Sequence, residues 1–159
     1  MDRIISKAIS QDMWQVLDLI KELAIFEKEP DAVEVTVADL QREGFGEQPL
    51  FSCFIAEVAT EIVGAAIVYF RFSTWKGRTI HLEDLIVKEA MRGQGVGAAL
   101  YAKVMKYGFY LGVKRIEWNV LDWNEGAIKF YERSGARVLD DWAVVQMDEQ
   151  GIKNYINNT

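Results

Sequence analysis

The hydrophobic positions of this chain follow two spacings, one typical of helices and one typical of strands. Apolar residues that recur every three or four positions predict four helices, over residues 10–26, 36–44, 96–111 and 125–133. Short apolar or alternating runs predict seven strands, over residues 3–9, 51–58, 62–73, 79–87, 115–121, 138–139 and 143–147. The tail, residues 150–159, is interpreted as a short helix or a frayed end.

Capping residues and turns indicate how these elements begin, end and connect. Ser10 is placed to cap the first helix, and Thr36 with Asp39 forms a variant of the capping box at the second. Helix ends are predicted at glycines, namely Gly44 with Gly46, Gly112, and Gly135. The early strands follow each other as hairpins, whereas the strand at 79–87 reaches the next one through a helix. This order predicts an α/β (α+β) fold, with a mixed sheet of about seven strands and about four helices.

Length and composition predict one soluble domain that spans residues 1–159. The chain has 159 residues, and half of them are apolar, which is enough for a full hydrophobic core. No apolar stretch has the length of a membrane-spanning helix, and no signal-peptide pattern opens the sequence, so we expect a cytoplasmic protein. The single cysteine, Cys53, lies among apolar neighbours, as buried cysteines do. A net charge of −6 argues against a nucleic-acid partner and suits a cationic substrate.

A glycine-rich turn separates the strand at 79–87 from the helix that follows. Its sequence, Arg92-Gly93-Gln94-Gly95-Val96-Gly97-Ala98, lacks the Gly-Lys-Ser/Thr of a phosphate-binding P-loop. Gly93, Gly95 and Ala98 satisfy the dinucleotide-binding fingerprint, but that motif leaves its strand directly, whereas residues 88–92 intervene here. The turn is either a simple connection or a pyrophosphate site at a helix N-terminus, with Arg92 as an added cation.

Two carboxylates interrupt the apolar strand before this turn. Glu83 and Asp84 are costly inside a sheet unless they are paired or functional. Adjacent strand residues point to opposite faces, so we expect only one of the two on each face, with His81 on the face of Glu83. No second histidine or cysteine accompanies His81, the only histidine, so no metal site is expected. A further acidic cluster, residues 27–31, is either a solvated loop or a substrate contact.

These motifs together resemble one known family. The glycine turn after a buried strand resembles the acyl-coenzyme A signature of the GNAT acyltransferases. Further segments resemble the spermidine/spermine (diamine) acetyltransferases and the related thialysine acetyltransferases, namely residues 19–24, 43–47, 82–84, 123–125 and 130–131. The resemblance implies the GNAT fold, in which two central strands splay apart and admit the thioester of acetyl-CoA, and no metal.

The resemblance also implies roles for individual residues. Glu83 matches the family's proposed base, and Tyr131 matches its general acid, since a phenol can protonate a departing thiolate. The cofactor-binding residues would be Leu85, Ile86, Val87, Arg92, Gly93, Gln94, Gly95, Val96, Gly97, Ala98, Asn124 and Ala127. The substrate-binding residues would be Phe26, Glu27, Trp75, Glu83, Asp84, Asp140, Asp141 and Trp142.

The expected function is transfer of an acetyl group from acetyl-CoA to a primary amine of a small cationic molecule, by a homodimer without membrane or nucleic-acid partners. The sequence departs from the family at Phe26, where the polyamine enzymes have a tyrosine, and in a shorter loop at Asp140. The acceptor could therefore be a diamine, spermidine, thialysine or another lysine-like amine. Two alternatives remain: a non-catalytic acyl-CoA binding module, or an enzyme acting on protein N-termini or other amines such as aminoglycosides. The presence of both Glu83 and Tyr131 favours an enzyme.

Overall fold

The computed structural model describes residues 2–159, which divide into two compact units. The first unit ends at Asn119, and the second is Val120–Thr159. Among residues 2–159, none of the helices combines the length and the apolar character that a bilayer crossing requires.

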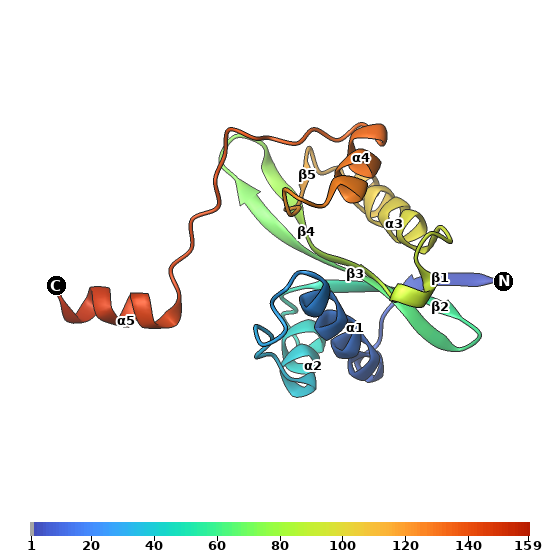
Figure 1. Ribbon diagram of the computed structural model, residues 1–159, viewed down its shortest axis with the longest axis horizontal. Coiled ribbons are helices and arrows are strands. Elements are labelled where there is room, and N and C mark those ends of the chain that lie inside the picture. Colours follow the sequence, from blue (N-terminus) through green and yellow to red (C-terminus); the bar gives the residue numbers. More distant parts are fainter. Residues whose placement is uncertain (1) are drawn as a thin grey trace. The chain divides into compact units, whose positions relative to one another are not determined.

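The first unit contains a five-stranded sheet (Figure 1). Its strands are β1 (Arg3–Lys7), β2 (Ser52–Val58), β3 (Glu61–Ser73), β4 (Gly77–Val87) and β5 (Ile116–Glu117). They lie side by side in chain order, β1 to β4 antiparallel and β5 parallel to β4. The parallel pair follows from the helical crossover between β4 and β5, because only antiparallel strands can be joined by a tight turn.

Helices cover both faces of this sheet (Figure 1). Helices α1 (Met13–Phe26) and α2 (Val37–Phe45) bury Met13, Leu19 and Leu40 against what we call the first face. Helix α3 (Val96–Leu111) buries its stripe of Val96, Leu100 and Val104 against the second face. Each core is closed by alternate residues of the central strands, as expected for a sheet that is buried on both sides.

Strand β4 contains an irregularity that decides which side chains share a face. Ile67 of β3 pairs with Asp84, but the next residue, Val68, pairs with Leu82, so Glu83 is an extra residue in β4. This is a β-bulge, which bends the strand and interrupts the alternation of side chains. Accordingly, Leu82 packs in the core of the second face, whereas Ile86 packs in the core of the first.

The pairing between β4 and β5 is short. It joins Ile80 to Ile116 and His81 to Glu117, and in the described ladder residues 82–87 of β4 have no partner on that side. The edge of β4 that faces β5 therefore opens from Leu82 onward, in agreement with the splayed strands implied by the family resemblance.

The second unit consists of two helices and the segment between them. Helix α4 (Glu125–Arg133) is capped by the Asn124 side chain, which accepts a hydrogen bond from the Ala127 N–H. Helix α5 (Glu149–Asn157) is capped in the same way by Asp148. The segment between them exposes Val144, Val145 and Met147.

The structure corrects several sequence predictions. The described residues form five strands and five α-helices, not seven and four. The two late strands, at 138–139 and 143–147, are wrong for this chain, because a strand needs a ladder partner and the described ladders include none for them. The strand predicted at 115–121 contains only Ile116–Glu117.

Helix ends were predicted with mixed success. The capping box of Thr36 and Asp39, the left-handed Gly112 at the end of α3, and the span of α4 are confirmed. Ser10 is not a cap, because residues 10–12 form a 3-10 turn in which Asp12 accepts the N–H of Ile9, and α1 begins at Met13. Gly44 does not end α2, which continues to Phe45 before Gly46.

Candidate active site

The glycine-rich turn forms the N-terminus of α3. It follows a 3-10 turn at Glu89–Met91, and Gly95 takes the left-handed conformation, with φ of 80°, just before the helix. The first backbone bond of the helix runs from the Ala99 N–H to the Gly95 carbonyl. The N–H groups of residues 96–98 therefore precede the helical ladder and point outward with the positive end of the helix dipole, an arrangement that suits an anion.

Gly97 provides a test of whether the turn fits a large ligand. Its backbone has no positive φ, and a Cβ built there would meet only Val87 Cγ2, at the ordinary contact distance of 3.5 Å. The packing of the protein therefore does not require glycine at this position. A bare backbone here is useful for close approach by a ligand, so the residues present fit a pyrophosphate group.

Two arginines lie at this turn, and sequence reasoning found only one. Arg92 donates to the Val87 carbonyl at 3.2 Å and lies over the Phe26 ring, 4.9 Å from its centroid. Arg3, from the distant β1, donates to the Gln94 carbonyl at 3.0 Å. No local signal could have revealed Arg3, because 91 residues separate it from Gln94 and only the sheet brings them together.

The bulge in β4 brings both of its carboxylates to the first face of the sheet. Asp84 pairs with Ile67 and lies two residues from Ile86, and both of these side chains pack in the core of the first face. Glu83 reaches His81 on that same face, with 3.4 Å between Glu83 Oε2 and His81 Nε2. The expectation that Glu83 and Asp84 point to opposite faces is therefore wrong, because the extra residue breaks the alternation. The expectation that His81 shares the face of Glu83 is confirmed.

The electrostatics show that a third carboxylate belongs to this group. Burial, together with the negative charges of Glu83 and Glu27, raises the pKa of Asp84 to about 6. Burial also raises the pKa of Glu27, which follows the last turn of α1. The charges of Glu83 and of Glu27, which directly follows α1, thus both act on Asp84, and a group of carboxylates attracts cations.

An aromatic ring and an imidazole line the same acidic group. Tyr69 of β3 is paired with His81, and their ring centroids are 5.1 Å apart. Burial raises the pKa of Tyr69, and the charge of Glu83 and a hydrogen bond with it add to the rise. Sequence reasoning missed Tyr69, although its place opposite His81 in the hairpin could have suggested it.

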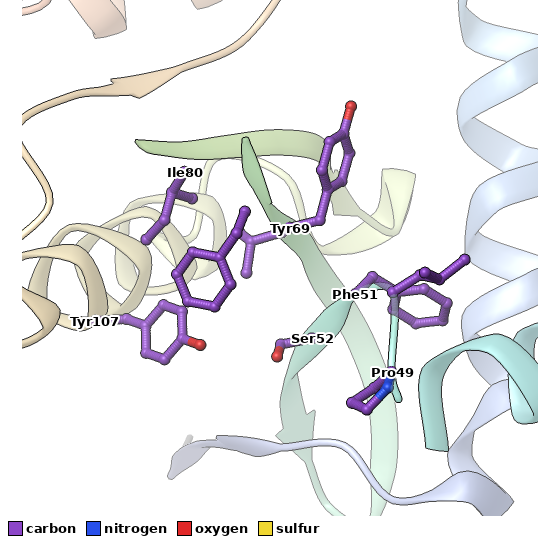
Figure 2. Close-up of a pocket in the computed structure, with 9 residues that line it drawn as sticks. Pro49, Phe51, Ser52, Tyr69, Ile80 and Tyr107 are labelled. Carbon is purple, nitrogen blue, oxygen red and sulfur yellow. The ribbon is translucent and has the colours of Figure 1, made fainter. Parts of the chain in front are cut away.

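A small pocket on the other side of the same strands does not include this acidic group. Its lining includes Ile80, Phe70 and Tyr107 together with residues 49–52. Figure 2 shows the Tyr69 ring pointing away from Ile80 and Tyr107. The lining of this pocket has no carboxylate or imidazole that could accept a proton from an ammonium, so we do not assign the chemistry to it.

The remaining predicted residues lie on other elements of the chain. Trp75 is 84% exposed at the tip of the β3–β4 hairpin, roughly 20 Å along the strand from Glu83 by the rise per residue. Tyr131 lies half-buried on α4, where its ring contacts Phe130. Asn124 and Ala127 lie at the start of the same helix. Asp140, Asp141 and Trp142 lie in the segment between α4 and α5 of the second unit.

Comparison with known proteins agrees with this architecture. Residues 13–136 match the model of the acetyltransferase (GNAT) family. The chain belongs to this family. A thialysine N-epsilon-acetyltransferase from Bos taurus is 38% identical over 146 residues, which cover 87% of this chain and 86% of that protein. The human spermidine/spermine N(1)-acetyltransferase-like protein 1 is 38% identical over 139 residues, which cover 83% of this chain but 20% of that protein.

Solved structures share the fold. An integron cassette protein from the mobile metagenome of V. cholerae superposes with a TM-score of 0.80 at 20% identity, and the match covers 98% of both chains. At that identity the likeness concerns the GNAT fold alone. The family model and the curated relatives together support an amine N-acetyltransferase.

Proposed function

We propose that this GNAT enzyme transfers an acetyl group from acetyl-CoA to a primary amine of a small molecule that carries a second positive charge. The observation that carries the proposal is that Glu83 and Asp84 lie on the first face of the sheet and that the charges of Glu83 and Glu27 both act on the buried Asp84. Such a group of carboxylates attracts an alkylammonium ion and can accept its proton. The names of the relatives agree with this substrate class, since thialysine and spermidine both carry more than one amine.

Acetyl-CoA supplies the activated acetyl group as a thioester. The N–H groups at the start of α3, with Arg92 and Arg3 beside them, would hold the pyrophosphate. The open edge of β4 at Leu85, Ile86 and Val87 would pair with the pantetheine arm, and a main-chain N–H of this edge would donate to the thioester carbonyl. Asn124 and Ala127 would add contacts from α4.

Glu83 and Tyr131 would manage the two protons of the reaction. Glu83, whose side chain is 52% exposed, takes a proton from the ammonium directly or through water, and the free amine attacks the carbonyl carbon. A C–N bond forms, the C–S bond breaks, and Tyr131 protonates the departing thiolate. The nitrogen loses its second proton to water as the amide forms, and the Tyr131 phenolate regains a proton from solvent.

The second charge of the substrate would be recognised by Glu27 and Asp84, and the ring of Phe26 adds an aromatic wall. Trp75 and residues Asp140, Asp141 and Trp142 are the further candidates for substrate contacts. We also propose that the two units form one acetyltransferase domain over residues 1–159 and that the enzyme works in the cytoplasm as a homodimer. The acceptor class covers diamines, polyamines, thialysine and other lysine-like amines.

A panel of amines tests this proposal. Release of free coenzyme A thiol should be faster with diamines than with monoamines of equal length. Glu27→Gln should lower kcat/KM for a diamine several-fold, about 1 kcal/mol for a partly solvated charge pair, and should affect a monoamine less. Glu29→Gln, two residues further along the exposed loop, is the matched control and should change neither.

The panel also separates the proposal from its alternatives. Equal losses on diamine and monoamine would show that the acidic residues after α1 are a solvated loop and not a substrate contact. Binding of acetyl-CoA without thiol release from any amine would favour a non-catalytic acyl-CoA module. Turnover restricted to peptide N-termini or aminoglycosides would favour a different acceptor class.

A further inference from the structure

A row of polar side chains crosses three strands and ends at Glu83. It begins on β5 with Glu117, whose carboxylate lies 2.6 Å from Arg71 Nη1. Arg71, on β3, places the same nitrogen 3.3 Å from His81 Nδ1. His81, on β4, then places Nε2 3.4 Å from Glu83 Oε2. The row therefore runs without a break from β5 to the carboxylate that we assign as the base.

The contact between Arg71 and His81 fixes the protonation of the imidazole. A guanidinium group has only donors, so His81 Nδ1 must be the acceptor and carries no proton. The single hydrogen of the neutral ring is then on Nε2, the nitrogen that faces Glu83. Burial lowers the pKa of His81, and the positive charge of Arg71 opposes protonation further, although the charges of Glu83 and Glu117 favour it.

Glu83 needs such a support more than an ordinary strand residue does. As the extra residue of the bulge it has no partner in β3, and its side chain is half exposed. Tyr69 also forms a hydrogen bond with Glu83, and without such contacts rotation would lower the fraction of time in which the carboxylate faces the substrate amine. His81, with a side chain only 10% exposed and its ring against Tyr69, offers a rigid donor beside it.

We propose that His81 is the positioning residue of Glu83: Arg71, anchored by Glu117, holds the His81 ring with hydrogen on Nε2, and this N–H directs and stabilises the ionised Glu83 carboxylate. The inference rests on the proposed role of Glu83 as base. His81 faces Glu83 at 3.4 Å, and in this proposal its effect reaches catalysis only through that carboxylate.

Several charged groups surround the pair and bear on its pH dependence. Tyr69 and Arg71 approach from β3, Asp84 lies beside Glu83 on β4, and Glu117 approaches from β5. Glu27, after α1, acts on Asp84. Arg115 lies 3.0 Å from the second oxygen of Glu117 and so helps to hold that carboxylate toward Arg71.

The first test is the tautomer, read by nitrogen NMR on protein without a histidine tag. His81 is the only histidine, so its ring signals need no assignment. We expect the Nε2–H tautomer at neutral pH, and Arg71→Leu should raise the pH at which the ring gains its second proton. An Nδ1–H tautomer in the wild type, or a ring that is already doubly protonated at pH 7, would overturn the proposal.

The second test is kinetic. His81→Leu should lower kcat about tenfold and move the acidic limb of the kcat/KM profile up by about one pH unit, because a donor favours the ionised carboxylate. The affinity for acetyl-CoA should not change. His81→Gln, which keeps an N–H near the place of Nε2, should recover most of both losses.

Glu83→Gln separates failure of this inference from failure of the proposed function. If Glu83→Gln keeps wild-type kcat, Glu83 is not the base and the proposed function fails at that step. If Glu83→Gln is impaired while His81→Leu keeps the wild-type kcat and pH profile, the positioning role is refuted and the base remains. In the Glu83→Gln background, His81→Leu should cause no further loss.

Discussion

Replacement of Asp84 by asparagine should make the protein more stable at neutral pH and a poorer enzyme. The pKa of Asp84 rises from the ordinary value of 3.8 to about 6, and burial is the largest cause. Each pH unit corresponds to about 1.4 kcal/mol, so keeping this carboxylate ionised costs the folded state about 3 kcal/mol. Asparagine has nearly the same shape and no charge, so the variant should gain stability of that order at pH 8.

The sign of the pH dependence follows from the direction of the shift. Between pH 3.8 and 6 the folded state binds more of this proton than the unfolded state does, so stability falls as the pH rises through that window. The advantage of Asp84→Asn should therefore be largest at pH 8 and should vanish only below pH 3.8. Urea unfolding of both proteins at several pH values measures it.

A matched control and an activity assay complete the experiment. Asp31→Asn makes the same chemical change at an exposed position and should not alter the pH dependence of unfolding. For the enzyme, Asp84→Asn should raise KM for diamines, because one charge of the acidic group is gone. Equal stability of Asp84→Asn and the wild type at pH 8 would refute the assignment of Asp84 as a strained, buried carboxylate.

Three further predictions concern the donor site, the acid and the assembly. Gly97→Val should abolish coenzyme A binding in calorimetric titration while the protein stays folded. The control Ala102→Val, further along α3, should leave binding intact. Unchanged coenzyme A affinity in Gly97→Val would exclude the turn as the binding site. Tyr131→Phe should lower kcat by about 10²–10⁴-fold with cofactor affinity nearly unchanged, and wild-type turnover would leave Tyr131 a packing residue. Sedimentation should show a homodimer, in which we propose that residues 138–147 contribute to the partner's sheet or site. Val145→Asp, at a position 91% exposed in the single chain, should dissociate it. A wild-type monomer at every concentration would contradict this.

The elements that depend on local signals could be predicted from the sequence. The helix at α3, its glycine turn and the capping box at Thr36 each follow from a few neighbouring residues, and the structure confirms them. The prediction of strands at 138–139 and 143–147 was wrong because a strand depends on a distant partner and not on local signals alone. An apolar run such as residues 143–147 shows that a segment can form a strand, but the partner that would complete its ladder does not appear in the sequence.

The bulge in β4 could not be predicted with the information in one sequence. The bulge changes which positions face the second core. Before it the even-numbered Ile80 and Leu82 pack there, and after it the odd-numbered Leu85 and Val87 do. Ile86 is also apolar and hides this change, because it packs on the first face. Without the fold, regular alternation is the simplest interpretation, and it separates two carboxylates that in fact lie together.

The bulge also connects the two halves of the proposed reaction. The ladder between β4 and β5 ends at His81, two residues before the extra residue Glu83. The same short segment of β4 therefore loses its pairing with β5 and interrupts the alternation of its side chains between the two faces. Just beyond this point, the backbone of residues 85–87 lies open on one edge for the acyl donor. Just before it, the side chain of Glu83 faces the acidic group on the first face. A variant without Glu83 would make the ladder regular and leave residues 84–87 with their present partners and faces. It would remove the bend of β4 together with the base, so we expect it to harm both acetyl-CoA binding at the open edge and amine recognition. Glu83→Gln keeps the bulge and should harm only the proton transfer. If the shortened chain still folds and binds acetyl-CoA as tightly as the Glu83→Gln protein, the bulge is not what joins the donor edge to the acceptor face.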